Sequence, residues 1–117
     1  MKRFLIGIAA VSLAAVLLQG VAAAAPTPTY DVTCVVGGET TATWRHVKLD
    51  QVTLEWFTAG STTAYASVTP PVTTHRPRGS VVSSAGTLPG IVPATVRVSF
   101  QHTKGAGTDQ VEAACTK

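Results

Sequence analysis

The chain lacks several features that identify common classes of protein. It has no apolar run as long as the roughly 20 residues that a bilayer-spanning helix needs. No Gly-x-Ser-x-Gly turn presents a nucleophilic serine, and only 13% of the residues are charged. The two cysteines lie too far apart in the sequence for a zinc or redox motif. We therefore expect no membrane-spanning helix, no zinc site and no serine hydrolase of that type.

The N-terminus has the three parts of a secretory signal peptide. A positive start at Lys2 and Arg3 is followed by an apolar run over residues 4–18. Small residues up to Ala24 then match the preference of a signal peptidase, so we expect cleavage after Ala24. Residues 1–24 are thus the predicted signal peptide, and the mature protein is predicted to be secreted. An uncleaved membrane anchor is the alternative, which the short apolar run disfavours.

Removal of the signal peptide changes the charge balance. The whole chain has nine Lys and Arg residues against six Asp and Glu residues. Lys2 and Arg3 leave with the signal peptide and no acidic residue does, so seven basic and six acidic residues remain, a net charge of +1. A nucleic-acid-binding protein needs a basic face that displaces counterions from phosphates. We therefore expect no nucleic-acid partner, and no membrane partner after cleavage.

The two cysteines predict one disulfide. Cys34 and Cys115 are the only cysteines of the chain, and export would carry both into an oxidising compartment. An even pair in that compartment predicts a bond between them. The bond would close a loop that includes nearly the whole mature domain, which makes it a large part of the expected stability.

Period-two alternation dominates the mature chain and predicts strands that are covered on one face. The clearest alternation is in residues 30–36, 52–57, 94–103 and 110–115. Weaker strands are expected in residues 64–68 and 79–83, and residues 41–50 are interpreted as strand, turn, strand rather than as a short helix. The chain also lacks asparagine and is rich in Val and Thr.

About seven strands with turn residues between them predict an all-β fold, a small antiparallel β-sandwich or a barrel. One domain over residues 30–117 accounts for the pattern, because the mature chain is long enough for one core. Residues 25–29, with the sequence "APTPT", are expected to form a Pro/Thr-rich N-terminal tail.

The segments around the cysteines resemble an immunoglobulin-like β-sandwich domain. "VTCVVGG" is similar to the first cysteine strand of that family, and Trp44 follows ten residues after Cys34. "DQVEAAC" is similar to the second cysteine strand, with Asp109 six residues before Cys115. Ala113 departs from the family, which has a characteristic tyrosine there. The resemblance implies a sandwich with a core disulfide and no particular function, because that fold hosts many. More broadly, the chain looks like a small secreted bacterial β-protein.

The titratable residues indicate no catalytic group, cofactor or metal site. The acids are scattered singly and mostly on outward faces, and His46, His75 and His102 lie far apart in the sequence. A lone histidine is more often structural or solvated than a ligand. We therefore expect a protein that is not an enzyme. A small hydrolase is kept as the second alternative, which would need acidic or His side chains that converge in a cleft.

The segment "PPVTTHRPRG", residues 70–79, is the one place where charge is concentrated. Its prolines cannot join a central ladder, and Pro77 holds Arg76 extended, so we expect an exposed loop. The residues predicted to contact a partner are His75, Arg76 and Arg78.

The predicted function is a small secreted non-catalytic protein with an extracellular binding, accessory or structural role. The expected partner is an extracellular protein or a cell-wall component. The first alternative is a protease inhibitor that presents the basic loop 70–79 to a trypsin-like enzyme. A plain solvated connection without a partner is the interpretation that the composition of the segment favours over both partner binding and inhibition.

Overall fold

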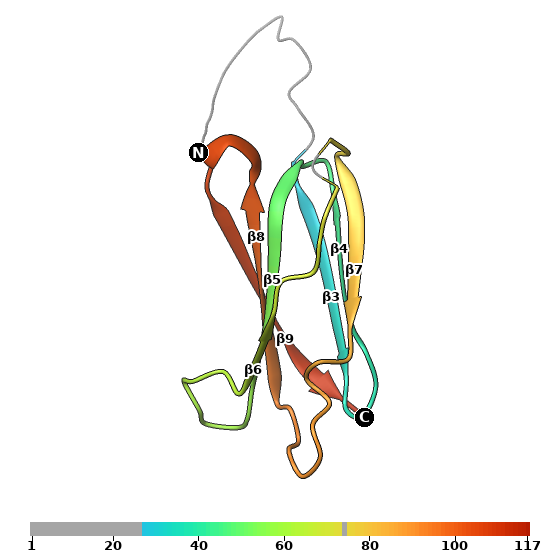
Figure 1. Ribbon diagram of the computed structural model, residues 1–117, viewed down its shortest axis with the longest axis vertical. Helices are drawn as coiled ribbons and strands as arrows, with labels where there is room; N and C mark the ends of the chain where they lie inside the picture. The colour runs from blue at the N-terminus through green and yellow to red at the C-terminus, as the bar shows by residue number, and fades with distance from the viewer. Residues whose placement is uncertain (1–26, 74) are drawn as a thin grey trace, which may run out of the picture.

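The computed structural model describes residues 27–73 and 75–117 (Figure 1). The predicted signal peptide, residues 1–24, and residues 25 and 26 of the predicted tail therefore lie outside the described residues. Within the described ranges, no helix is long and apolar enough to cross a bilayer.

The regular structure of the described residues is almost entirely strand, which confirms the all-β prediction. In chain order the elements are β3 (Thr29–Val35), β4 (Thr40–Arg45), β5 (Leu49–Phe57), β6 (Ala66–Val68), β7 (Arg78–Ser83), β8 (Thr95–His102), the 3-10 turn η1 (Thr103–Gly105) and β9 (Thr108–Thr116). Residues 41–50 form strand, turn, strand, as predicted. The turn contains His46 with a φ of 63°, and the register shifts between Leu49 and Gln51.

The seven strands form one sheet in the order β6-β5-β8-β9-β3-β4-β7. All pairings are antiparallel except that of β3 with β9, which is parallel. The parallel pairing aligns only Cys34 with Cys115 and Val35 with Thr116. The prediction of an antiparallel fold is therefore wrong at this one join, because alternation along a strand carries no information about the direction of its neighbour.

The sheet folds over so that β4 and β7 face β5 and β8, and the core fills the space between (Figure 1). Along β4, Thr40, Ala42 and Trp44 are buried while the residues between them are not, which is the pattern of a strand covered on one face. Trp56 of β5 donates its indole N–H to Thr40 Oγ1 at 2.9 Å. Trp44 meets Phe100 of β8 edge-on, with 6.3 Å between ring centroids.

The predicted disulfide between Cys34 and Cys115 is present, with 4.5 Å between the two Cα atoms. It joins β3 to β9 at the place where these strands pair, and the Cys34 side chain is buried in the core. The bond spans a sequence separation of 81 residues. In the chain-entropy model, closure of a loop of about 80 residues stabilises a domain by about 4.5 kcal/mol.

We expect reduction of the disulfide to remove most of the thermal stability, because a typical domain is stable by only about 5–15 kcal/mol. The measurement is the melting temperature with and without reductant, with circular dichroism as the method that monitors unfolding. Replacement of Cys34 and Cys115 by Ala should lower the melting temperature in the same way. Melting curves that coincide under both conditions would show that the bond is dispensable.

We expect Thr40→Val to lower the free energy of unfolding by about 1–3 kcal/mol, because the buried indole N–H of Trp56 loses its acceptor. Thr41→Val is the matched control, since its side chain is on the opposite face of β4 and should change the stability by no more than about 0.5 kcal/mol. Denaturant titration measures both values. Equal effects of the two substitutions would contradict a role for this hydrogen bond.

Candidate functional site

The predicted loop 70–79 is shorter than expected at its C-terminal end. The connection from β6 to β7 ends at Pro77, and Arg78 is the first residue of β7. Arg78 lies directly opposite Arg45 of β4 in the antiparallel register. Like charges directly opposite each other destabilise a strand pair, so this arrangement weakens the end of the sheet.

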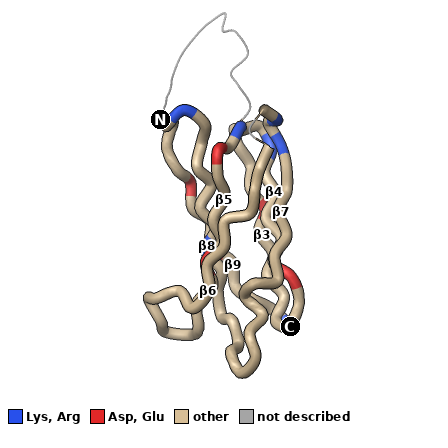
Figure 2. Tube along the Cα trace, viewed as in Figure 1, with Lys and Arg blue, Asp and Glu red and all other residues tan. Residues whose placement is uncertain are grey.

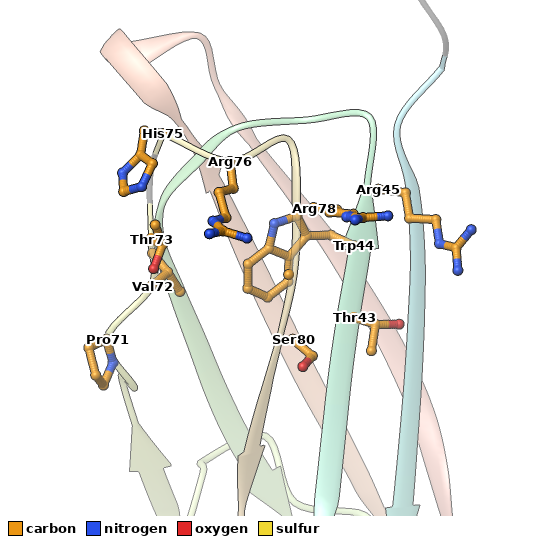
Figure 3. Close-up of a pocket in the computed structure, with 11 residues that line it drawn as sticks. Thr43, Trp44, Arg45, Pro71, Val72, Thr73, His75, Arg76, Arg78 and Ser80 are labelled. Atoms are coloured by element: carbon orange, nitrogen blue, oxygen red, sulfur yellow. The ribbon is translucent and has the colours of Figure 1, made fainter.

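A cavity of about 740 Å³ is lined by residues 71–73, 75 and 76 together with residues of β4 and β7, and we call it the basic groove (Figure 3). All three residues predicted to contact a partner line it, namely His75, Arg76 and Arg78. Arg45 and Trp44, which the sequence did not indicate as site residues, also line it. A second cavity of about 480 Å³ adjoins the same three arginines and His46.

The side chain of Trp44 forms the floor of the basic groove. The residue is only 3% exposed, and its Nε1 is the one buried side-chain nitrogen or oxygen without a hydrogen-bond partner in the described ranges. A buried N–H without an acceptor costs about 1–3 kcal/mol. Gly79 lies against the ring, and a Cβ at this position would overlap it, so only glycine lets β7 pack here.

The three arginines of the basic groove form no ion pair with any described residue. The two ion pairs of the described ranges are elsewhere, Arg97 with Glu55 at 3.3 Å and His102 with Asp109 at 3.0 Å. Arg45, Arg76 and Arg78 are exposed, and Figure 2 shows basic residues gathered at the ends of β4 and β7. An exposed guanidinium group without an ion pair can donate two parallel hydrogen bonds to the oxygens of one carboxylate or phosphate.

A second polar cluster lies where β3 passes β8 and β9. The hydroxyl of Tyr30 donates to Asp109 Oδ2 at 2.6 Å, and His102 Nε2 lies 3.1 Å from that hydroxyl and 3.0 Å from the same carboxylate oxygen. The Tyr30 ring also stacks on Phe100, with 4.3 Å between centroids. Sequence reasoning missed this cluster, because 72 and 79 residues separate Tyr30 from its two partners.

The pKa values of the cluster indicate a structural role. Burial and the hydrogen bond to Asp109 raise the pKa of the Tyr30 hydroxyl far above its usual range. Hydrogen bonds from Tyr30 and from His102 lower the pKa of Asp109. The phenol therefore keeps its proton and the carboxylate keeps its charge, so Tyr30 is not poised as a nucleophile and Asp109 is not poised as a general acid. The cluster fastens β3 to β8 and β9.

Neither polar cluster has the composition of a metal centre. In the ranges that the structure describes, no three His, Cys, Asp or Glu side chains come together in a way that could hold a metal ion. Comparison with known proteins finds no match, whether with a family model, a curated protein or a solved structure.

The lowered pKa of Asp109 makes the stability depend on pH. Because folding lowers this pKa, the carboxylate stabilises the fold above the usual Asp pKa of about 4, and this contribution is lost as the pH falls through the lowered pKa. We expect Asp109→Asn to reduce the fall in melting temperature over that acidic range. Asp50→Asn, an exposed control with the same change of charge, should leave the acid dependence as it is. Identical pH profiles for both variants would contradict this interpretation.

Proposed function

We propose that the protein is a small secreted protein without catalytic activity that binds an anionic extracellular partner through the basic groove. The observation that carries the proposal is the group formed by Arg45, Arg76 and Arg78, which have no acidic partner in the described ranges and line one cavity. The signal-peptide pattern of residues 1–24 and the disulfide support the secreted location.

The electrostatics of the basic groove support a partner that brings its own negative charge. The repulsion between Arg45 and Arg78 lowers the stability of the protein without a partner. An anion between or beside the two side chains would attract both, so the net electrostatic interaction there would become favourable. The backbones of Arg45 and Arg78 are held in paired strands, so only their side chains lose freedom on binding. A carboxylate-rich or phosphate-rich extracellular protein or cell-wall polymer has the required chemistry.

We also propose that the folded-over sheet is a β-sandwich of the immunoglobulin-like type. The buried Trp44, the two cysteine strands and the facing of β4 with β5 and β8 support this assignment. The disulfide joins two neighbouring strands where the halves of the sheet meet.

Binding is favoured over protease inhibition by the position of the cleavable bond. The peptide bond between Arg78 and Gly79 lies inside β7, where both residues pair with β4. A bond held in a sheet must leave that sheet before it can enter a protease cleft. Arg76 is on the connection itself, but Pro77 follows it, and such proteases do not cut before proline.

We expect the Arg76→Ala/Arg78→Ala variant to elute from immobilised poly-L-glutamate at a clearly lower salt concentration than the unmodified mature domain. Charge-assisted contacts from exposed arginines are lost, and they are screened by salt. The control is Lys104→Ala/Lys117→Ala, which removes the same net charge away from the groove. Both variants should keep their melting temperatures within a few degrees, because exposed substitutions change stability by about 0.5 kcal/mol or less.

Equal loss of retention in the two double variants would contradict the proposal, since net charge alone would then explain the binding. A drop of many degrees in the melting temperature of Arg76→Ala/Arg78→Ala would also contradict it, because the arginines would then be structural.

A further inference from the structure

We propose that the partner of the basic groove is an extended acidic peptide that adds to the free edge of β7 as a further strand of the sheet. This inference rests on the proposed function, because it names the class of partner that the same groove takes. It adds a mode of binding, in which main-chain hydrogen bonds supply affinity and the arginines supply selectivity.

The backbone of β7 has one free edge. The strand is the last in the sheet order, and all six of its residues are aligned with β4. None of the other backbone hydrogen bonds of the described ranges involves residues 78–83. The N–H and C=O groups that point away from β4 are therefore available to another strand.

The two edges of the sheet differ in how they are protected. The opposite edge is β6, which has three residues and is followed by Pro70 and Pro71, so it offers little to an added strand. β7 has twice that length and contains no proline, no lysine and no register shift. Val82 on its outer face is 51% exposed. Such an edge is a template for another chain.

The basic groove adjoins the first half of this free edge, because Arg78, Gly79 and Ser80 of β7 line it. Figure 3 shows Pro71, Thr73 and His75 on the side of β7 away from β4, and these residues also line the cavity of about 740 Å³. An added strand would lie about 4.8 Å from β7, in this space. The outward side chains of β7 are Arg78, Ser80 and Val82, which alternate with the inward Gly79 and Val81.

The order of the outward side chains determines the complementary sequence. Arg78 is the first residue of β7 and Arg76 points toward it from the other side of the groove, so acidic side chains on the added strand would face these two guanidinium groups. Val82 at the other end favours an apolar side chain on the same face. The partner is therefore a strand with acidic residues at alternate positions at one end and β-branched residues at the other.

The first test measures binding of two capped, fluorescent heptapeptides, Glu-Thr-Glu-Thr-Val-Thr-Val and its reverse, by fluorescence polarisation. Two sequences are needed because an added strand can be parallel or antiparallel to β7. We expect at least one to bind, and replacement of its Glu residues by Lys to weaken binding more than tenfold. Val82→Glu should weaken binding to the same extent, whereas Val92→Glu, an exposed control outside β7, should not.

The second test uses N-methylation of the peptide that binds. In an added antiparallel strand, alternate residues direct both backbone groups toward the neighbour. N-methylation of one alternate set should therefore weaken binding more than tenfold, while methylation of the other set changes it less than threefold. A parallel strand also has this dependence on alternate N–H groups.

The outcomes separate this inference from the proposed function. Strand addition is overturned if no peptide binds or if the two methylated peptides bind equally well. The proposed function still stands in that case, provided that retention on poly-L-glutamate requires Arg76 and Arg78. If the unmodified mature domain neither is retained on poly-L-glutamate nor binds a peptide, the proposed function and strand addition are both overturned. A dimer in sedimentation experiments that Val82→Glu dissociates would also overturn the inference, because a second copy of the chain would then occupy the edge.

Discussion

A single short contact between β3 and β9 holds the sheet together. Only two register pairs join these strands, and the disulfide of Cys34 with Cys115 is one of them. β4 and β7 are connected to the rest of the sheet through β3 alone, as the strand order shows. At the other end of β3, the hydrogen bonds of Tyr30 with Asp109 and His102 replace a backbone ladder. The position of the basic groove, which is built on β4 and β7, therefore depends on this join and on the core beneath it.

Stability and proposed function are located at different ends of β4. Thr40 accepts the hydrogen bond of the buried Trp56, so one end of the strand is satisfied and well packed. At the other end, Trp44 keeps a buried N–H without an acceptor and Arg45 lies opposite Arg78. These two unfavourable features at one place support the proposal that this end of β4 belongs to a binding site, since local rules of stability are broken mainly where a function requires it. The disulfide and the Trp56 contact offset that cost elsewhere.

The sequence allowed prediction of the elements but not of most contacts between them. Alternation predicted the main strands because one face of each is covered, and an even pair of cysteines after a predicted signal peptide predicted the disulfide. The parallel direction of β9 against β3 could not be predicted, because the period of a strand is the same in both directions. The pairing of Arg45 with Arg78 depends on the register of β4 with β7, which hydrophobic alternation fixes only to within steps of two residues. For this reason the predicted loop 70–79 included Arg76 and Arg78 of the basic groove but not Arg45, which lies opposite Arg78 on another strand.

The outer faces of the two halves of the sheet differ in the residue that lies opposite an arginine. Arg97 on β8 lies opposite Glu55 on β5, forms an ion pair with it at 3.3 Å, and places its guanidinium 4.8 Å from the centre of the Phe57 ring. That arginine is engaged within the protein, and it covers Phe57, which is only 7% exposed although its neighbour Trp56 occupies the inner face. Arg45 has Arg78 at the equivalent cross-strand position, so neither has a charge to satisfy it within the described ranges. One arginine of the sheet is thus paired with a carboxylate while two others lie opposite each other, and the proposed binding of an anionic partner is based on this difference.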